Sequence, residues 1–343
     1  MIASRIVCLL GLGLWLGLAG AERARPRTAV AELFPAPAGG WPVQVETGDL
    51  SRTLAEVDNP NARYLLGVPA DYTPEKTYPL WVVLHGSEGD PSGMAWVFRS
   101  SLSARGAISV FPKALHDNRL LEWNYPEEGL YLMAIIREIA RTYRIDPTRM
   151  YLGGHSMGGG GTWALGALTH ELWAGIAPLS GWYAATPRPE VKLLARMPIY
   201  AIHGDQDHAV AIDNSRIAVA ALAKIGCATA TLTERPESEA LAQPRLAAAG
   251  VIYRELPGVG HDIFQPWDQL GVHEIALLVS WLSARQRATP ADFTAALQRL
   301  EQWGARSGWS SAGTPCGTFA GAPARAAAKP ADARKPDRDA NRR

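Results

Sequence analysis

The sequence predicts an α/β fold, in which a mostly parallel central sheet is covered by helices on both faces. Short apolar segments of strand type alternate along the chain with longer segments of helical periodicity, and this order is typical of such sheets. Segment 127–143 has apolar residues at i, i+3, i+4, i+7 and i+11 counted from Leu132, which predicts a helix with one buried face. Roughly 320 residues would remain after removal of a leader, a length that suits one large domain with appendages.

Strands are predicted wherever a short apolar run is followed by turn residues. Segment 271–287 predicts a second long helix, and Thr289-Pro290 opens a last helix ending near Trp303. Segment 228–234 is also strand-like, and the residues from there to 250 predict either a helical hairpin or a strand with a substrate-side cap. The predicted strands are 43–46, 64–68, 80–84, 108–111, 150–153, 175–179, 199–203 and 251–256.

The segment "MYLGGHSMGGGGTWALGAL" places one serine, Ser156, at a bend between a predicted strand and a predicted helix. Gly154 and Gly158 flank it in a G-x-S-x-G pattern, and residues without a Cβ accept the crowded backbone of such a bend. In this strand–turn–helix context the pattern is typical of a nucleophile elbow. The alternative is a glycine-rich turn that holds an ordinary serine.

A serine nucleophile needs a base within hydrogen-bond reach and a third group that orients the base. Downstream, "IYAIHGDQDHAV" and "VIYRELPGVGHDIF" each end a predicted strand in a polar turn. We therefore predict His261 as the base and Asp207 as the orienting acid, in the chain order Ser, Asp, His. Asp205 is the alternative acid and could instead cap its loop, while Asp262 is expected to bond locally.

Three further histidines lie near these segments. His155 and His203 are expected to be packing and loop-bonding residues. His208 is predicted as a structural loop residue, with a place in the wall of the cleft as the alternative.

An oxyanion intermediate needs preorganised N–H donors. The predicted strand "YPLWVVL" breaks into His85-Gly86-Ser87, a turn that can present a backbone amide. We predict the amides of Ser87 and of Met157, the residue after the nucleophile, as the donors. A plain strand-to-helix turn is the alternative.

Together, "YLLGVPADY", "YPLWVVLHG", "YRIDPTRMYLGGHSMGGGGTW", "HGDQDHAV" and "PGVGHD" resemble the α/β-hydrolase superfamily. Within it, the chain is similar to exported esterases of the poly(3-hydroxybutyrate) depolymerase-like and feruloyl esterase-like groups and to prolyl oligopeptidase-like hydrolases. The resemblance covers about residues 63–282. It implies a serine hydrolase that cleaves carboxylic esters through Ser156, His261 and Asp207, with a serine peptidase or a non-catalytic polymer-binding module as alternatives.

Two segments, 114–129 and 180–190, follow strands and project from the edge that would carry these residues. Their aromatic side chains are predicted to wall a substrate site, although anchoring of the loops onto the core would explain them equally well. The expected substrate is a small-molecule or polymeric ester. The four aromatic residues are Trp123, Tyr125, Trp182 and Tyr183.

Composition excludes several classes of function. The chain has 34 basic and 33 acidic residues and a formal net charge of +1, so nothing favours nucleic acid as a partner. No Cys/His spacing of a metal site and no phosphate-binding glycine pattern is present. We therefore expect no cofactor and no metal.

The chain begins with an apolar run that follows Arg5, is too short to span a bilayer and ends in Ala19-Gly20-Ala21. We predict a signal peptide over 1–21, export to the periplasm or medium, and no stable membrane insertion after cleavage; a retained anchor is the alternative. A proline-rich linker over 22–40, a catalytic domain over 41–306 and a disordered Ala/Pro/Arg-rich tail over 307–343 would follow. An exported chain could pair Cys227 with Cys316, although Cys316, in the tail, could equally stay free.

Overall fold

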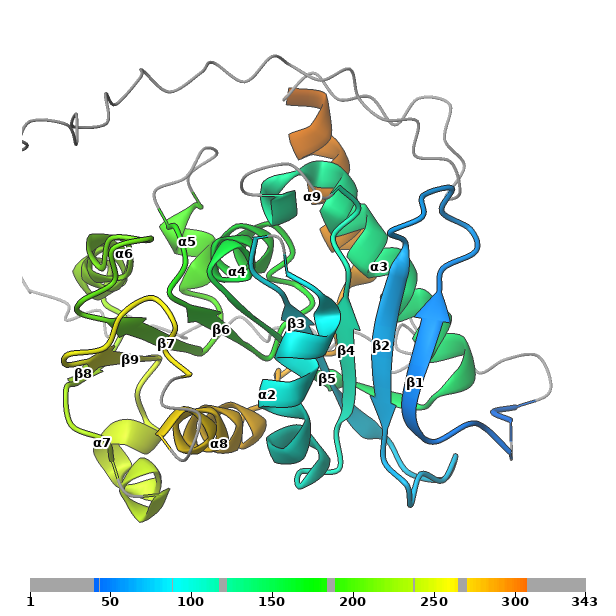
Figure 1. Ribbon diagram of the computed structural model, residues 1–343, viewed down its shortest axis with the longest axis horizontal. Helices are drawn as coiled ribbons and strands as arrows, with labels where there is room; N and C mark the ends of the chain where they lie inside the picture. The colour runs from blue at the N-terminus through cyan, green and yellow to red at the C-terminus, as the bar shows by residue number, and fades with distance from the viewer. Residues whose placement is uncertain are drawn as a thin grey trace, which may run out of the picture.

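The protein folds around one nine-stranded sheet, seen in a computed structural model that describes residues 40–42, 44–87, 89–116, 122–183, 189–236, 238–264 and 270–306. The strand order is β1-β2-β4-β3-β5-β6-β7-β9-β8 (Figure 1). β1 and β2 are antiparallel to their neighbours, and the pairs from β4 onward are parallel. The strands are β1 Gly48–Thr53, β2 Arg63–Val68, β3 Tyr78–Leu84, β4 Ile108–Pro112, β5 Ile145–His155, β6 Gly175–Leu179, β7 Ile199–Gly204, β8 Thr229–Leu232 and β9 Val251–Leu256.

Helices cover both faces of the sheet, as the sequence predicts. α2 and α8 pack together on one face, while α3, α4, α6 and α9 contribute to the core on the other (Figure 1). Their bounds are α2 Pro91–Ser103, α3 Pro126–Thr142, α4 Met157–Leu168, α5 Val191–Leu194, α6 Asp213–Lys224, α7 Pro244–Ala247, α8 Leu270–Ser283 and α9 Phe293–Arg306, with 3₁₀ turns η1 Glu122–Asn124 and η2 Ser238–Ala242.

The central strands are buried on both faces, which explains their continuous apolar sequences. All seven residues of β3 are buried. Trp81 and Val83 belong to the core under α2 and α8, whereas Leu80, Val82 and Leu84 belong to the opposite core. The strand period of two therefore divides one apolar run between two layers.

The first strand differs from the prediction. β1 lies at Gly48–Thr53, and the predicted segment 43–46 is not a strand where the structure describes it. Pairing decides this, because β1 forms a hairpin with β2 in which Gly48 faces Val68 and Thr53 faces Arg63. An Asx turn closes the connection, since Asn59 Oδ1 accepts a hydrogen bond of 2.8 Å from the amide of Asn61.

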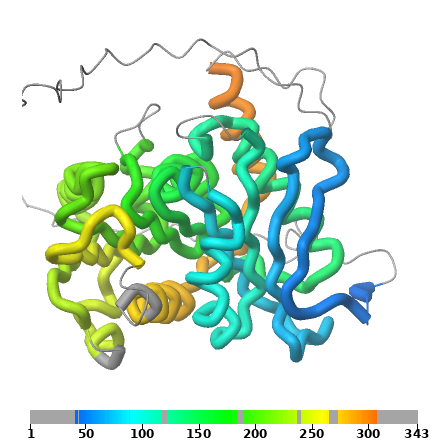
Figure 2. The backbone as a smooth tube through the Cα atoms, viewed as in Figure 1, coloured from blue at the N-terminus to red at the C-terminus, as the bar shows by residue number. Residues whose placement is uncertain are grey.

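The segment before β9 adds a strand to the opposite edge of the sheet. β8 pairs in parallel with β9, so the strand-like character of 228–234 is confirmed. The yellow-green part of the tube, to which both strands belong, lies at the end of the molecule opposite the blue N-terminal strands (Figure 2). Between β8 and β9 lie two short helical segments, the 3₁₀ turn η2 and the four-residue α7. Its last turn packs on α8, where Trp281 Nε1 donates to the carbonyl of Leu246 at 3.0 Å and Arg285 donates to that of Ala247 at 2.9 Å.

Several predictions concern residues outside the described ranges. The leader, nearly all of the linker, the tail and Cys316 lie there. Within the described ranges, no helix combines the length and the apolarity that crossing a membrane requires.

Candidate active site

Ser156 lies at the sharp bend between β5 and α4. Its backbone has φ 58° and ψ −116°, which is the left-handed region that a residue with a Cβ adopts at a cost of about 1–3 kcal/mol. The amide of Ser156 donates to the carbonyl of Leu179 at 2.9 Å, and its carbonyl accepts from Gly160 at 2.9 Å. The bend is therefore held from β6 and from the first turn of the helix.

The glycines around Ser156 are required by close backbone contacts. A Cβ on Gly154 would lie 2.5 Å from the carbonyl oxygen of Gly158, and a Cβ on Gly158 would lie 2.2 Å from that of Leu84. A Cβ on Gly159 would likewise lie 2.3 Å from the carbonyl oxygen of Leu179. The first turn of α4 therefore sits directly on the ends of β3 and β6, which explains a run of poor helix formers at a helix start.

We expect Gly158→Ala to destabilise the fold by about 3 kcal/mol or more, because the added methyl group would overlap the backbone of β3. Gly160→Ala is the matched control in the same turn. A Cβ there would lie 3.5 Å from its nearest neighbour, an ordinary contact with Trp182, so the higher helix propensity of alanine is expected to stabilise by roughly 0.5–1 kcal/mol. Urea unfolding of both variants measures this difference, and equal stabilities would contradict the packing argument.

The three predicted catalytic side chains form one chain of hydrogen bonds. His261 Nε2 lies 2.8 Å from Ser156 Oγ, and His261 Nδ1 lies 2.8 Å from Asp207 Oδ2. The Asp207 side chain is fully buried, whereas that of His261 is 27% exposed. Ser156 is 7% exposed. This geometry lets a proton pass from Ser156 to His261 while the carboxylate holds the ring.

Asp207 is fixed by its own loop. Its Oδ1 accepts hydrogen bonds from the amides of Ala209 and Val210 at 2.9 and 2.8 Å. Burial by itself would raise the pKa of Asp207, but the hydrogen bonds from His261, Val210 and Ala209 outweigh it and hold this pKa below the ordinary value. The carboxylate is therefore charged at neutral pH.

A second histidine, His203, also faces this carboxylate. Its Nε2 lies 3.1 Å from Asp207 Oδ2 and 2.9 Å from the carbonyl of Val210. Burial lowers the pKa of His203, so the ring is neutral and Nε2 carries the proton that it donates. The sequence predicts His203 as a packing and loop-bonding residue. Its contact with Asp207 was not predicted, because it depends on how the loop after β7 folds back.

The other polar residues of these turns bond locally. Asp205 Oδ1 accepts from the amide of Gly258 at 2.7 Å and so caps the loop before His261, and Asp262 Oδ1 accepts from the amide of Phe264 at 3.2 Å. His208 is exposed. Of the two candidate acids, Asp207 is the one that contacts His261.

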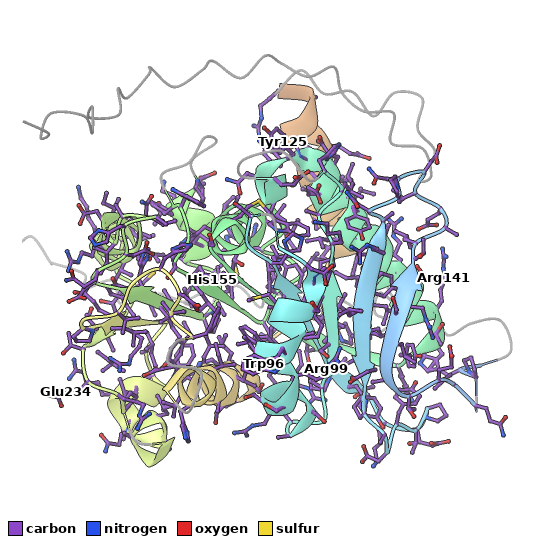
Figure 3. All side chains as sticks on the ribbon, viewed as in Figure 1. Trp96, Arg99, Tyr125, Arg141, His155 and Glu234 are labelled. Carbon is purple, nitrogen blue, oxygen red and sulfur yellow. The ribbon has the colours of Figure 1, made fainter. Side chains whose placement is uncertain are left out.

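His155 supports the loop that carries His261. Its Nε2 lies 2.9 Å from the carbonyl of His261, and the two ring centroids are 5.0 Å apart; Figure 3 places His155 near the centre of the molecule. Burial lowers the pKa of His155 from 6.5 to about 4. The neutral ring therefore donates its Nε2 proton to that carbonyl.

This pKa predicts a pH dependence of stability. Between pH 6.5 and 4 the unfolded chain takes up a proton at His155 that the folded chain refuses, so stability is expected to fall with pH by up to about 3 kcal/mol from this group. His155→Gln cannot titrate and is expected to flatten the profile in that window. Urea unfolding at pH 7 and pH 4.5 measures the effect, with His208→Gln on the exposed loop as the control. An unchanged slope in His155→Gln would contradict the prediction.

Of the two predicted oxyanion donors, one adjoins Ser156 in the chain and the other belongs to the loop after β3. Met157 is the first residue of α4, and the first amides of a helix have no intrahelical acceptor. Ser87 follows Gly86, where a Cβ would lie 3.3 Å from Ser156 Cβ, so this loop lies close against the serine. The His85 carbonyl accepts from Trp123 Nε1 at 3.0 Å, and Lys113 Nζ donates to the carbonyl of Gly89 at 3.0 Å. The loop is thus anchored on both sides.

The four predicted substrate-binding aromatics divide into two pairs. Trp123 is fully buried against Gly161 of α4, and Tyr183 is 2% exposed and packs edge-on against Trp163. These two offer no surface to a substrate and anchor their loops onto the core. Tyr125 is 38% exposed at the start of α3 (Figure 3), and Trp182 is partly buried.

This sheet order, with a strained serine after β5 and a histidine loop after β9, defines an α/β-hydrolase fold. Comparison with solved structures confirms the fold. A thermostable esterase is 24% identical with a TM-score of 0.50 over 70% of this chain and 62% of its own. A ferulic acid esterase is 17% identical with a TM-score of 0.51 over 70% of this chain and 99% of its own.

Curated proteins with similar sequences include two named for esterase activity. The bifunctional acetylxylan esterase/xylanase XynS20E of Neocallimastix patriciarum is 28% identical over 148 residues, which is 40% of this chain and 20% of that protein. NocK of Nocardia uniformis subsp. tsuyamanensis, named as a suspected esterase, is 26% identical over 217 residues, 55% of this chain and 59% of that protein. The chain thus matches less than two thirds of either relative. No protein-family model matches it.

Proposed function

We propose that this protein is a serine hydrolase that cleaves carboxylic esters. The observation that carries the proposal is the pair of 2.8 Å contacts from Ser156 Oγ to His261 Nε2 and from His261 Nδ1 to Asp207 Oδ2. The strained backbone of Ser156 and the close approach of the loop at Gly86 support it. Similarity to proteins named as esterases favours esters over amides.

In the proposed mechanism, Ser156 Oγ attacks the ester carbonyl while His261 Nε2 takes the hydroxyl proton. Asp207 accepts from Nδ1 and stabilises the imidazolium. The amides of Ser87 and Met157 donate to the oxyanion. The intermediate collapses as His261 returns the proton to the leaving alcohol, and a water activated by His261 then releases the acyl group from Ser156.

The substrate would lie beside the exposed ring of Tyr125 and the partly buried Trp182. We propose these two, rather than Trp123 and Tyr183, as the aromatic contacts of the acyl or alcohol group. Flat aromatic surfaces suit apolar or sugar-like groups. Within the described ranges, the loops around Ser156 present no pair of acidic or of basic side chains that would require a substrate of opposite charge.

Labelling of the mature protein with a fluorophosphonate tests the proposal. Modification should map to Ser156 and disappear in a His261→Ala variant. A panel of p-nitrophenyl esters of increasing acyl length, run beside proline-containing amides, then identifies the reaction. Preferential amide cleavage would favour a peptidase, and no labelling of a folded sample would favour a non-catalytic binding module.

We further propose export, with cleavage after Ala21, a linker to residue 40 and a tail from residue 307. The apolar leader with its small-residue site supports this. N-terminal sequencing of the protein from a periplasmic or medium fraction would start at Glu22. A start at Met1 in the membrane fraction would indicate a retained anchor.

A further inference from the structure

Three titratable side chains outside the proposed catalytic chain converge behind the loop that follows β3. They are His116 after β4, Glu122 of η1 and Glu128 in the first turn of α3, and one ligand atom from each lies within 4.8 Å of the other two. The side chains of Glu122 and Glu128 are 1% and 0% exposed, whereas that of His116 is 27% exposed. The sequence did not predict this cluster because its members do not follow a metal-binding spacing.

The cluster is short of positive charge. Among the described residues, the ion pairs of Glu122 and Glu128 involve His116 alone, with Nδ1 at 2.7 and 3.6 Å from their respective Oε1 atoms. A buried carboxylate without a compensating charge is costly. Among these described residues, one imidazolium at most faces two buried carboxylates, and a further cation or a proton would balance their charge.

The buried oxygens also lack hydrogen-bond donors. In the described part of the chain, Glu122 Oε1 and Glu128 Oε2 accept no hydrogen bond. The 2.7 Å contact between Glu122 Oε1 and His116 Nδ1 is not a hydrogen bond. An ion bound between these atoms would supply the missing partner of each, after the side chains separate to the roughly 3.3 Å that two ligands of one tetrahedral ion require.

The second oxygen of Glu128 is already oriented. Glu128 Oε1 accepts from the amide of Leu115 at 2.9 Å, which is the kind of outer contact that holds a ligating carboxylate in place. The side chain of His116 is 27% exposed, while its Nδ1 and the two unsatisfied carboxylate oxygens are buried.

We propose that His116, Glu122 and Glu128 bind a divalent transition-metal ion, with Zn²⁺ as the best match. One imidazole nitrogen and two carboxylates suit Zn²⁺, whereas Ca²⁺ and Mg²⁺ take oxygen ligands. The ion supplies the missing positive charge. It joins the segment after β4 to η1 and α3.

The bound ion has a structural consequence for the loop after β3. The amide of Ala114 donates to His85 Nε2 at 3.0 Å, and Trp123 Nε1 donates to the carbonyl of His85 at 3.0 Å. Ala114 and Trp123 are each within two residues of a ligand. The ion therefore stiffens the loop that ends beside Ser156 without touching a substrate.

Titration of tag-free, EDTA-treated full-length protein with ZnCl₂ tests the proposal, by calorimetry, metal analysis and melting temperature. We expect one equivalent to bind and to raise the melting temperature. Glu122→Gln and Glu128→Gln should each weaken binding at least about tenfold, the loss typical of even an outer-shell partner. Glu127→Gln, in the same turn of α3 but outside the cluster, is the matched control and should bind as the wild type does.

Three outcomes would overturn the proposal. The first is no stoichiometric binding to the wild type, which needs no variant to fold. The second is binding that persists in the Glu122→Gln/Glu128→Gln double variant, or a preference for Ca²⁺ over Zn²⁺. The third is evidence that a proton, rather than a metal ion, occupies the cluster. Burial and then the charge of Glu122 raise the pKa of Glu128 to about 8. If a proton is the occupant, Glu128→Gln raises the melting temperature of the metal-free protein and Zn²⁺ does not.

Discussion

Replacing Ser156 with alanine is expected to lower kcat/KM for ester hydrolysis by about 10⁴- to 10⁶-fold, because no other group can form the acyl intermediate and triad members act as a unit. The residual rate would come from the oxyanion amides and from substrate binding. Steady-state kinetics on a p-nitrophenyl ester measures the loss. The substitution removes only an oxygen, so the fold is expected to remain intact by circular dichroism.

Ser103→Ala is the matched control, since Ser103 is exposed at the end of α2. It should keep the wild-type rate. A Ser156→Ala variant that retained most of the hydrolysis would remove Ser156 from the mechanism, and with it the proposed function.

Asp207→Asn is expected to lower kcat by about 10⁴-fold while leaving the fold intact. The amide oxygen can still accept from Ala209 and Val210, which bond to Oδ1 at 2.9 and 2.8 Å. The NH₂ group would then face His261 Nδ1. That donor favours the tautomer with its proton on Nε2, so His261 could no longer take the proton of Ser156.

Asp205→Asn in the same turn separates this effect from a general disturbance. Its oxygen can still accept the 2.7 Å hydrogen bond from the amide of Gly258, so near wild-type kinetics are expected. A pH–rate profile adds a second readout, because a lost base alters the acid limb as well as the plateau. Equal losses in the two variants would contradict the assignment of Asp207.

The elements with the clearest periodicity were predictable. The helix at 127–143 corresponds to α3, because a long one-sided apolar stripe is typical of a helix. The strand before His85 corresponds to β3, because a short apolar run bounded by turns is typical of a strand. The first strand was misplaced, since edge strands are only half buried and the burial of β1 alternates between intermediate and exposed. Its position depends on pairing with β2, which local sequence does not encode.

The candidate site, too, could be predicted only in part from the sequence. The meeting of Ser156, His261 and an acid from the turn after β7 was predictable, because each lies in a turn directly after a strand and parallel strands bring such turns to one edge of the sheet. The roles of the aromatics were not. Trp123 and Tyr183 are aromatic, as residues of a pocket wall often are, yet Trp123 packs on Gly161 and Tyr183 on Trp163.

The sequence by itself determined the α/β layering and the order of the chemical groups, since apolar periodicity and turn residues act locally. Only the tertiary structure decided which acid faces His261, why Gly158 must lack a side chain and which charges meet at Glu128. These three features depend on distances between segments far apart in the chain. A Cβ on Gly158 would lie 2.2 Å from the carbonyl oxygen of Leu84, and Asp207 Oδ2 lies 2.8 Å from His261 Nδ1. Packing sets these distances, because interiors are dense enough for a single methyl group to matter.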